Sequence, residues 1–278
     1  MKPDPDAAEL YLDLMKKCLT RYIFPEKSTL VQRHHPRFLP WIVHSPIAVF
    51  LKKRGMTLHR EVTVDLGMRA EGKDWPPDAE TMVGLKRLDN LQFCIREVIR
   101  EEAPGDFIET GAWRGGASIL MRAALEAYGD KSRQVWVADS FEGLPNADGR
   151  YAQDEGDPHW KNNDFLSVSL EQVKANFSRY GLLDERVHFL KGWFKNTLPT
   201  APIEKLAILR LDGDMYSSTM DSLVNLYPKL SKNGYIIIDD YGSTEPCHKA
   251  TEDFRAGQKI DTPLNIIDAY GVYWKKMS

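Results

Sequence analysis

Apolar and polar positions along this chain follow helical and strand periods in turn. Residues 8–22 carry apolar side chains at helical spacing, and residues 81–102 do the same until Pro104 and Gly105 end the pattern. Beyond that point, short apolar runs alternate with longer amphipathic segments. We therefore predict strands at 107–110, 134–139, 187–190, 206–211 and 235–238, helices at 117–128, 170–180, 218–230 and 245–256, and a terminal pair of strands at 264–267 and 272–275.

Alternation of strand and helix is typical of an α/β fold with a doubly wound, mostly parallel sheet. We assign residues 81–278 to one such domain and residues 1–80 to an N-terminal addition. The addition begins with the helix at 8–22. Residues 24–63 then mix prolines, basic residues and short apolar runs without a sustained period, so we assign no element there.

Composition narrows the class of partner. The 278 residues include 37 lysines and arginines against 40 aspartates and glutamates, so the chain lacks the positive excess typical of proteins that bind nucleic acid or anionic membranes. No apolar run reaches the length of a membrane-spanning helix. Three cysteines without a CxxC spacing, and a first segment without a signal-peptide core, predict a cytoplasmic protein that acts on a small molecule.

Two pairs of acids follow two predicted strands. Asp212 and Asp214 come directly after one apolar strand, and Asp239 and Asp240 come directly after the next. The carboxyl ends of parallel strands lie at one edge of a sheet, so we expect the four carboxylates to converge, with Asp212 and Asp214 on the same side if the extended geometry continues. One such acid alone would be a solvated residue or a helix cap. Four together repel unless a cation bridges them, and oxygen ligands favour a hard ion such as Mg²⁺.

A glycine-containing loop joins the first predicted strand of the sheet to its helix. Gly111, Gly115 and Gly116 depart from the Gly-x-Gly-x-x-Gly spacing of dinucleotide-binding loops, which disfavours a nicotinamide-dependent dehydrogenase. Glu109 opens the loop and suits a ligand with an ammonium group, and the amino end of the following helix suits a carboxylate. S-adenosylmethionine carries both groups. The alternatives are that Glu109 caps the helix and that the glycines serve close packing alone.

The next two strand ends add candidates for the same cofactor. Asp139, at the end of the second strand, is placed to accept hydrogen bonds from two ribose hydroxyls. Gly192 and Trp193 follow the third strand, where the indole ring would form a wall for adenine. A turn-stabilising role for Asp139 and a core position for Trp193 are the alternatives.

These motifs together resemble the macrocin O-methyltransferase family, whose members methylate sugar hydroxyls on antibiotics and related natural products. The resemblance rests on Leu10-Tyr-Leu-Asp-Leu14, Thr81-Met-Val-Gly-Leu-Lys-Arg-Leu-Asp-Asn90, Glu109-Thr-Gly-Ala-Trp-Arg-Gly-Gly116, Arg179-Tyr-Gly-Leu-Leu183, Gly192-Trp-Phe194, Arg210-Leu-Asp-Gly-Asp214 and Ile238-Asp-Asp-Tyr241. It covers the first helix and most of the chain from Met68 onward. Residues 29–62 show no family pattern, which leaves both substrate selection and packing open as their role.

The resemblance implies a Rossmann-like class I methyltransferase fold, S-adenosylmethionine as methyl donor and Mg²⁺ as the required ion. Asp212, Asp239 and Asp240 match the family's metal ligands, and Asp214 matches its general base. Family members are often dimers or higher oligomers, and one of their segments closes near the cofactor at the positions of Thr81 and Met82. The residues that we expect at the cofactor are Thr81, Met82, Glu109, Gly111, Ser118, Asp139, Ser140, Gly192 and Trp193.

From these observations we predict metal-dependent transfer of a methyl group from S-adenosylmethionine to a sugar hydroxyl of a glycosylated natural product. Methylation of a catechol is the nearest alternative, because a phenolic diol chelates Mg²⁺ in the same way. A non-catalytic ligand-binding protein with this fold is a second alternative, which the complete set of acids disfavours. His159, in a polar loop after the second strand, is either solvated or placed near the acceptor.

Overall fold

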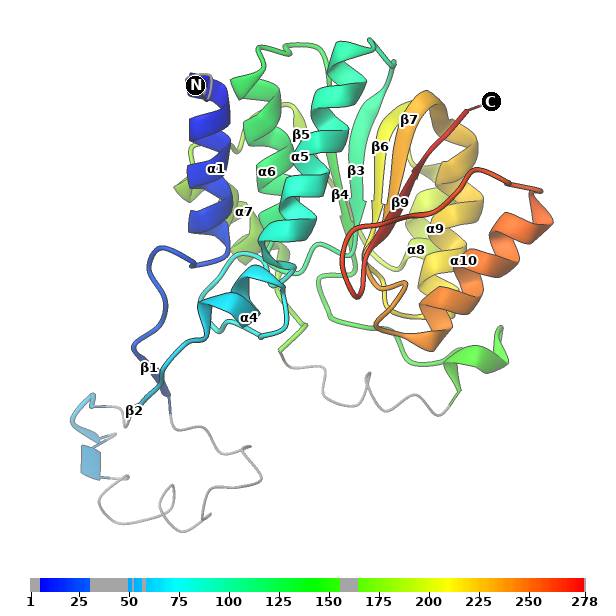
Figure 1. The fold of residues 1–278 in the computed structure, drawn as a ribbon. Coiled ribbons are helices and arrows are strands. Elements are labelled where there is room, and N and C mark those ends of the chain that lie inside the picture. The colour runs from blue at the N-terminus through cyan, green and yellow to red at the C-terminus, as the bar shows by residue number, and fades with distance from the viewer. Residues whose placement is uncertain (1–5, 31–49, 52, 57–58, 156–164, 278) are drawn as a thin grey trace.

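The computed structural model describes residues 6–30, 50–51, 53–56, 59–155 and 165–277. The prediction for His159 and most of the 29–62 segment fall outside these ranges. Within them, the sequence folds as three layers, with a central sheet between two layers of helices (Figure 1).

The described strands of the central sheet lie in the order β5-β4-β3-β6-β7-β9-β8. The first five in this order are parallel, and β9 runs antiparallel to both β7 and β8. Their bounds are β3 (Asp106–Thr110), β4 (Val135–Asp139), β5 (Val187–Lys191), β6 (Leu206–Leu211), β7 (Leu230–Ile238), β8 (Asn265–Ile266) and β9 (Val272–Lys275). This order confirms the doubly wound, mostly parallel sheet and the terminal strand pair.

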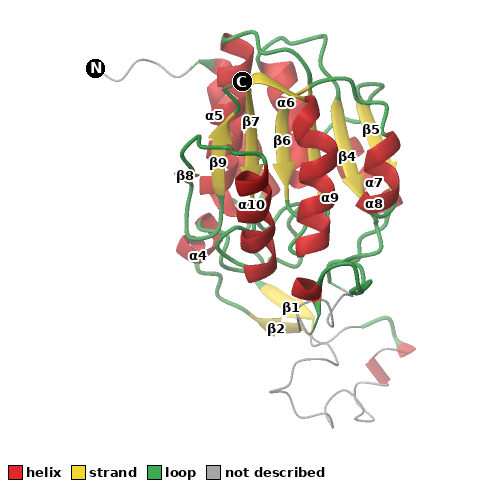
Figure 2. Ribbon diagram, turned by 90° about the vertical axis from the view of Figure 1, so that its right-hand side faces the viewer, coloured by secondary structure: helices red, strands yellow, loops and turns green. Residues whose placement is uncertain are grey.

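Helices cover both faces of the sheet (Figure 2). One layer contains α1 (Ala7–Leu19), α5 (Gly84–Arg100), α6 (Gly116–Ala127) and α7 (Leu170–Arg179), and the other contains α8 (Phe194–Thr197), α9 (Tyr216–Leu226) and α10 (Glu245–Gly257). Alternate strand residues enter opposite cores. Phe107 and Ile237 join the cluster under the first layer, whereas Ile108 and Ile236 join the cluster under the second. Central parallel strands bury both faces, which explains why all of β6 is buried.

The helix α1 packs on α5 and α6 and shares their core. Its residues Leu12 and Leu19 are fully buried. The carbonyl of Leu19 accepts hydrogen bonds from Glu80 N at 3.0 Å and from Thr81 N at 3.2 Å. The chain therefore leaves the core and returns to it at the same point. The domain boundary after residue 80 stays a prediction.

The chain between these two points contains short elements that the sequence pattern did not predict. Two strands, β1 (Ser28–Leu30) and β2 (His59–Glu61), pair antiparallel and project from the body of the protein (Figure 1). The helix α4 (Leu66–Ala70) begins where the Asp65 carboxylate accepts from Gly67 N and Met68 N. We left residues 24–63 unassigned, because three-residue strands are too short to show a period.

Three predicted helix ends were wrong. The helix expected to reach Tyr22 ends at Leu19, because Arg21 has a φ of +56° and Tyr22 N donates back to Lys17 O at 2.9 Å. The helix expected from Thr81 begins at Gly84, because Val83 N donates to Thr81 Oγ1 and Thr81 to Val83 instead run along the cavity. The helix expected to reach Leu230 ends at Leu226. A short 3₁₀ helix containing Pro228 follows, and Leu230 already belongs to β7. None of the helices within the described ranges is both long and apolar enough to cross a membrane.

Candidate functional site

A cavity of about 630 Å³ lies at the carboxyl ends of the parallel strands. Each of these strands contributes a lining residue at its end or just beyond it: Gly111 after β3, Asp139 at the end of β4, Trp193 after β5, Asp212 after β6 and Asp239 after β7. The volume falls in the range of about 300–1,000 Å³ that small-molecule sites occupy. The sheet edge predicted from the sequence is therefore the edge that carries the cavity.

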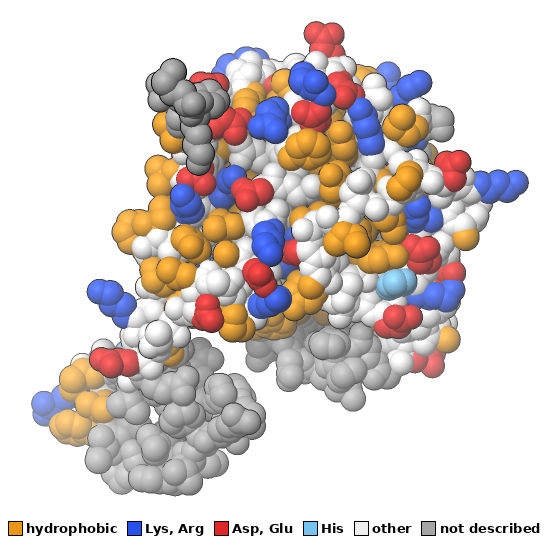
Figure 3. Space-filling model, viewed as in Figure 1, with side chains coloured by type: hydrophobic (Ala, Val, Ile, Leu, Met, Phe, Trp, Pro, Cys, Tyr) orange, Lys and Arg blue, Asp and Glu red, His pale blue; other side chains and the backbone are white. Residues whose placement is uncertain are grey.

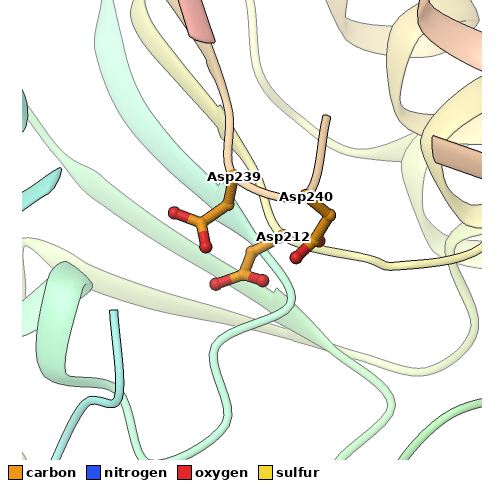
Figure 4. A group of neighbouring side chains, drawn as sticks. All are labelled: Asp212, Asp239 and Asp240. Atoms are coloured by element: carbon orange, nitrogen blue, oxygen red, sulfur yellow. The ribbon is translucent and has the colours of Figure 1, made fainter. Parts of the chain in front are cut away.

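Three of the predicted acids come together at the base of this cavity. One carboxylate oxygen from each of Asp212, Asp239 and Asp240 lies within 4.8 Å of the others. Figure 4 shows the three carboxylates around a common space, with Asp212 from the end of β6 and the other two from the end of β7. Burial is the main cause that raises the pKa of Asp212, and the charge of Asp239 adds to it. Burial also raises the pKa of Asp240 well above its ordinary value, and there the charge of Asp214 adds to it. Without a cation, ionised carboxylates oppose one another here.

Asp214 lies in a strained turn between β6 and α9. Its φ is +57°, and Met215 N donates to Gly213 O over 2.5 Å, which is the hydrogen bond of a γ-turn with positive φ. Asp214 N donates to Asp240 Oδ2 at 3.1 Å, and its carbonyl accepts from Thr244 Oγ1 at 2.7 Å. The condition of an extended chain from Asp212 to Asp214 is not met, because the strand ends at Leu211. Asp214 nevertheless lines the cavity beside the acid cluster.

Arg210 is the buried centre of the site. Its Nη1 donates to Glu109 Oε1 at 2.5 Å and to Asp212 Oδ2 at 2.9 Å, and its Nη2 donates to Asp239. Burial alone would lower the pKa of this guanidinium, but Asp239 and Asp212 raise it above its ordinary value. Arg210 therefore stays charged and connects the acid cluster to the strand that carries Glu109.

A second guanidinium reaches the cluster from α5. Arg87 donates to Asp239 through Nη1, and its Nε lies 3.2 Å from Asp268 Oδ2. Both oxygens of Asp239 thus accept from arginine, which fixes the orientation of the carboxylate. Such outer contacts are typical of metal-ligating carboxylates.

The donor set fits a hard divalent cation. The described carboxylates in and beside the cluster outnumber the guanidinium groups of Arg87 and Arg210. They belong to Glu109, Asp212, Asp214, Asp239, Asp240 and Asp268. Oxygens bound to one Mg²⁺ lie up to about 4.2 Å apart, since each Mg–O distance is about 2.1 Å. The three aspartates need only small movements from 4.8 Å to meet that limit. The identity of the ion as Mg²⁺ stays a prediction.

We expect the substitution Arg210→Met to lower the free energy of unfolding by about 3–5 kcal/mol, because it leaves the buried carboxylate of Glu109 without its counter-charge. Urea unfolding followed by tryptophan fluorescence measures the loss. The control is Lys249→Met, which removes an exposed pair with Asp253 and should leave the unfolding free energy nearly unchanged. Similar losses in the two variants would contradict the role assigned to Arg210.

The cavity brings together most of the residues predicted for the cofactor. Its lining includes Thr81, Met82, Glu109, Gly111, Asp139, Ser140 and Trp193. Ser118 and Gly192 are not among the lining residues: Ser118 is fully buried behind Glu109. Gly111 has a φ of +90°, and a Cβ there would lie 1.6 Å from the carbonyl oxygen of Asp212. Glycine is needed at this position so that the loop and the acid cluster can meet.

Protein groups already engage two of these acids. Glu109 accepts from Ser118 N at 2.9 Å and so caps α6 from the neighbouring strand, and burial raises its pKa to about 7. Asp139 accepts from Ala112 N and Phe141 N, each at 2.7 Å, and therefore joins the glycine loop to its own loop. Glu109 therefore caps a helix and Asp139 stabilises a turn, which are the alternatives that the sequence left open for these two residues. Contacts of these carboxylates with a cofactor stay predictions.

The amino end of α6 also has protein partners. Gly116 N donates to Glu80 O at 2.9 Å, and a Cβ on Gly116 would lie 2.6 Å from that oxygen. The segment that precedes Thr81 thus packs directly on the helix end where we expected a cofactor carboxylate. A cofactor carboxylate at this helix end stays a prediction, and the main-chain contact explains why glycine occupies position 116.

Sequence reasoning missed the charged rim of the cavity. Arg150 donates to both oxygens of Asp221 at 2.8 and 2.9 Å, and Asp148 Oδ2 accepts from Arg150 Nε and Lys195 Nζ at 2.8 Å each. These contacts hold the loop after β4 against α8 and α9. No local pattern signals pairs so far apart in sequence. Arg210, by contrast, was detectable, because a charged residue inside an apolar strand needs an internal partner.

Comparison with known proteins gives one consistent family. The sequence profile described as Macrocin-O-methyltransferase (TylF) matches residues 8–276. The chain is 49% identical over 272 residues to 8-demethyl-8-(2,3-dimethoxy-alpha-L-rhamnosyl)-tetracenomycin-C 4'-O-methyltransferase of Streptomyces olivaceus, covering 97% of this chain and 94% of the relative. It is 46% identical over 271 residues to demethyldecarbamoylnovobiocin O-methyltransferase of Streptomyces niveus, with the same two coverages of 97% and 94%.

Solved structures agree with this result. The O-methyltransferase NovP superposes with a TM-score of 0.83 at 44% identity, covering 98% of this chain and 100% of NovP. The calicheamicin methyltransferase CalS11 has a TM-score of 0.50 at 16% identity, covering 98% of this chain and 94% of its own, and shares the fold alone. The Rossmann-like class I methyltransferase fold that the motifs implied is confirmed.

Proposed function

Because this chain belongs to the macrocin O-methyltransferase family, we propose that it methylates a sugar hydroxyl of a glycosylated natural product. The chain is an S-adenosylmethionine-dependent O-methyltransferase, like its relatives. The relative from Streptomyces olivaceus is named for a rhamnosyl tetracenomycin, and that from Streptomyces niveus for a novobiocin precursor. Identity above 40% over nearly the whole chain is the observation that carries the proposal.

The charge of the cavity supports a neutral glycoside over a nucleotide-linked sugar. The described lining residues include eight carboxylates but only four cationic side chains, which are Lys73, Arg87, Arg150 and Lys195. Each of these cations is already paired with a carboxylate. A diphosphate would therefore meet a negative cavity without an unpaired cation among these residues. A sulfonium cofactor and a metal cation suit the same excess of negative charge.

The residues at the strand ends divide the chemistry between them. In the proposed mechanism, Asp212, Asp239 and Asp240 would hold a Mg²⁺ ion, and Thr81, Met82, Gly111, Asp139 and Trp193 would bind S-adenosylmethionine. When bound, the ion supplies Lewis-acid stabilisation of a developing alkoxide. The Asp214 carboxylate accepts the proton of the acceptor hydroxyl as the new O–C bond forms and the C–S bond of the sulfonium breaks. The cavity walls must align the acceptor oxygen, the methyl carbon and the sulfur, because the displacement is in line.

A mass-shift assay tests the function. The enzyme, S-adenosylmethionine and Mg²⁺ are incubated separately with a deoxysugar glycoside, its free aglycone, a nucleotide-linked deoxysugar and a catechol. We expect a gain of one methyl on the glycoside alone, with the methyl located on the sugar by fragmentation. Methylation of the catechol or the aglycone instead would overturn the proposed acceptor.

We also propose that the protein forms a homodimer through the outer face of α1. Leu10, Tyr11 and Leu14 are exposed on this helix, and Figure 3 shows apolar side chains along the edge of the molecule where α1 lies. Apolar residues that share one exposed helix face are typical of association surfaces. We expect light scattering to give twice the chain mass for the wild type and the mass of one chain for the double variant Leu10→Glu/Leu14→Glu. A wild-type monomer would contradict this proposal.

A further inference from the structure

Asp154 lies in a short 3₁₀ helix, η1 (Ala152–Asp154), in the loop that follows β4. Its side chain is 3% exposed and does not line the cavity. One oxygen accepts from Tyr216 N at 2.8 Å, and the other accepts from Ser217 N at 3.0 Å. The carboxylate therefore makes charge-assisted bonds with the first two amides of α9, although it comes from a distant part of the chain.

These two bonds replace the cap that α9 lacks in its own sequence. The residue before the helix is Met215, whose side chain makes no capping hydrogen bond. The first amides of a helix have no internal partner and carry partial positive charge. Asp154 thus satisfies the amino end of α9 from outside the helix.

The capped end directly follows the γ-turn that carries Asp214. A non-glycine residue with positive φ is strained, and it keeps this conformation only when its surroundings hold it there. Asp240 binds the amide of Asp214, and Thr244 binds its carbonyl. Asp154 holds the chain immediately after the turn. The contact from Asp154 differs from those of Asp240 and Thr244, because Asp154 belongs to the loop that forms one wall of the cavity.

Other contacts attach the same loop to α9. The rings of Tyr151 and Tyr216 lie 4.8 Å apart, and the Arg150 guanidinium binds both oxygens of Asp221 on α9. The neighbouring residues Leu144, Pro145 and Asn146 line the cavity. One buried carboxylate therefore joins the cavity wall to the position of the proposed base.

We propose that Asp154 is a positioning residue for Asp214: by capping α9 it holds the γ-turn so that the Asp214 carboxylate faces the acceptor hydroxyl. This inference rests on the proposed function, in which Asp214 is the base. It assigns Asp154 no contact with substrate, cofactor or metal. Its loss therefore acts on turnover through Asp214 and leaves cofactor binding in place.

A double-mutant cycle tests the inference. kcat and KM are measured for Asp154→Asn and Asp154→Ala, alone and combined with Asp214→Asn, and kcat is expressed per cofactor site counted by titration with S-adenosylmethionine. We expect each single Asp154 variant to lose about 10- to 100-fold in kcat, as small misplacements of a catalytic group do, with KM for the cofactor unchanged. In the Asp214→Asn background the same changes should have almost no further effect, because residues that act as a unit are not additive.

Asp65→Ala is the matched control. Asp65 also accepts from two amides at the start of a helix, at 2.8 and 3.1 Å, but it caps α4 and does not line the cavity. We expect its kcat to equal that of the wild type. A comparable loss in this variant would show that any missing cap lowers turnover and would overturn the inference.

The cycle separates this inference from the proposed function. An equal loss in both backgrounds would remove the positioning role of Asp154 while leaving Asp214 as the base. Near-normal turnover of Asp214→Asn alone would remove the base and the inference with it. If Asp154→Ala does not fold, Asp154→Asn decides the result, because the amide matches the carboxylate in shape and opens no cavity.

Discussion

Replacing Asp214 with asparagine is expected to lower turnover by about two to four orders of magnitude, the usual contribution of a general base. The amide keeps the shape of the side chain but cannot accept the hydroxyl proton. The main-chain bonds of residue 214 with Asp240 and Thr244 do not involve its side chain, so the turn and the acid cluster should persist. Steady-state kinetics by mass spectrometry measures the loss.

Two binding measurements accompany the Asp214→Asn kinetics. Titration calorimetry with S-adenosylmethionine and with Mg²⁺ should give affinities within about threefold of the wild type, since a change in chemistry alone leaves ground-state binding intact. Asp261→Asn, at an exposed position, is the control for the substitution itself and should retain full turnover. Turnover of Asp214→Asn close to that of the wild type would remove Asp214 as the base.

Chelation is expected to abolish activity, and added Mg²⁺ is expected to restore it. The three clustered aspartates provide only oxygen ligands, and the negative charge around them exceeds that of the two arginines. The reaction should therefore stop in excess EDTA and resume when Mg²⁺ exceeds the chelator. Full activity in EDTA would exclude a requirement for a metal ion in turnover.

Thermal unfolding gives a readout of the same ion that is independent of activity. A ligand that binds only the native state at 100 times its Kd stabilises it by about 2.7 kcal/mol, so Mg²⁺ should raise the Tm of the wild type. Asp240→Asn removes one ligand and should remove most of this shift. Ca²⁺ serves as a comparison, because its longer bonds to oxygen suit a wider site. A larger shift with Ca²⁺ than with Mg²⁺ would contradict the choice of Mg²⁺.

Much of the fold follows from local patterns in the sequence. The apolar runs that became β3, β4, β6 and β7 are buried parallel strands, and such strands read as continuous apolar segments. The acids that end β6 and β7 could be placed together because strand polarity determines which ends meet. The motif resemblance to the macrocin O-methyltransferase family is confirmed by the match over residues 8–276.

The features that escaped prediction depend on distant contacts. In the sequence, nothing distinguishes Asp154 from other acids in loops. Only the fold shows that it lies at the start of α9. The pairs between Arg150 and Asp221 and between Lys195 and Asp148 likewise join separate loops and helices. Boundary errors had a different cause. Thr81 to Val83 continue the apolar pattern of α5, but they line the cavity instead of entering the helix.

The segment between Leu19 and Glu80 leaves the core and returns to it at one point, which affects how such enzymes can diversify. Residues 20–79 begin and end at one carbonyl, and this excursion supplies Gly72, Lys73 and Trp75 to the cavity lining. Doubling the length of a closed loop costs only about 0.6 kcal/mol, so we expect insertions between the described elements of this segment to cost the core little stability. We therefore expect that residues of this segment can be exchanged, and the cavity lining changed with them, while the strand ends that carry the acid cluster keep their geometry.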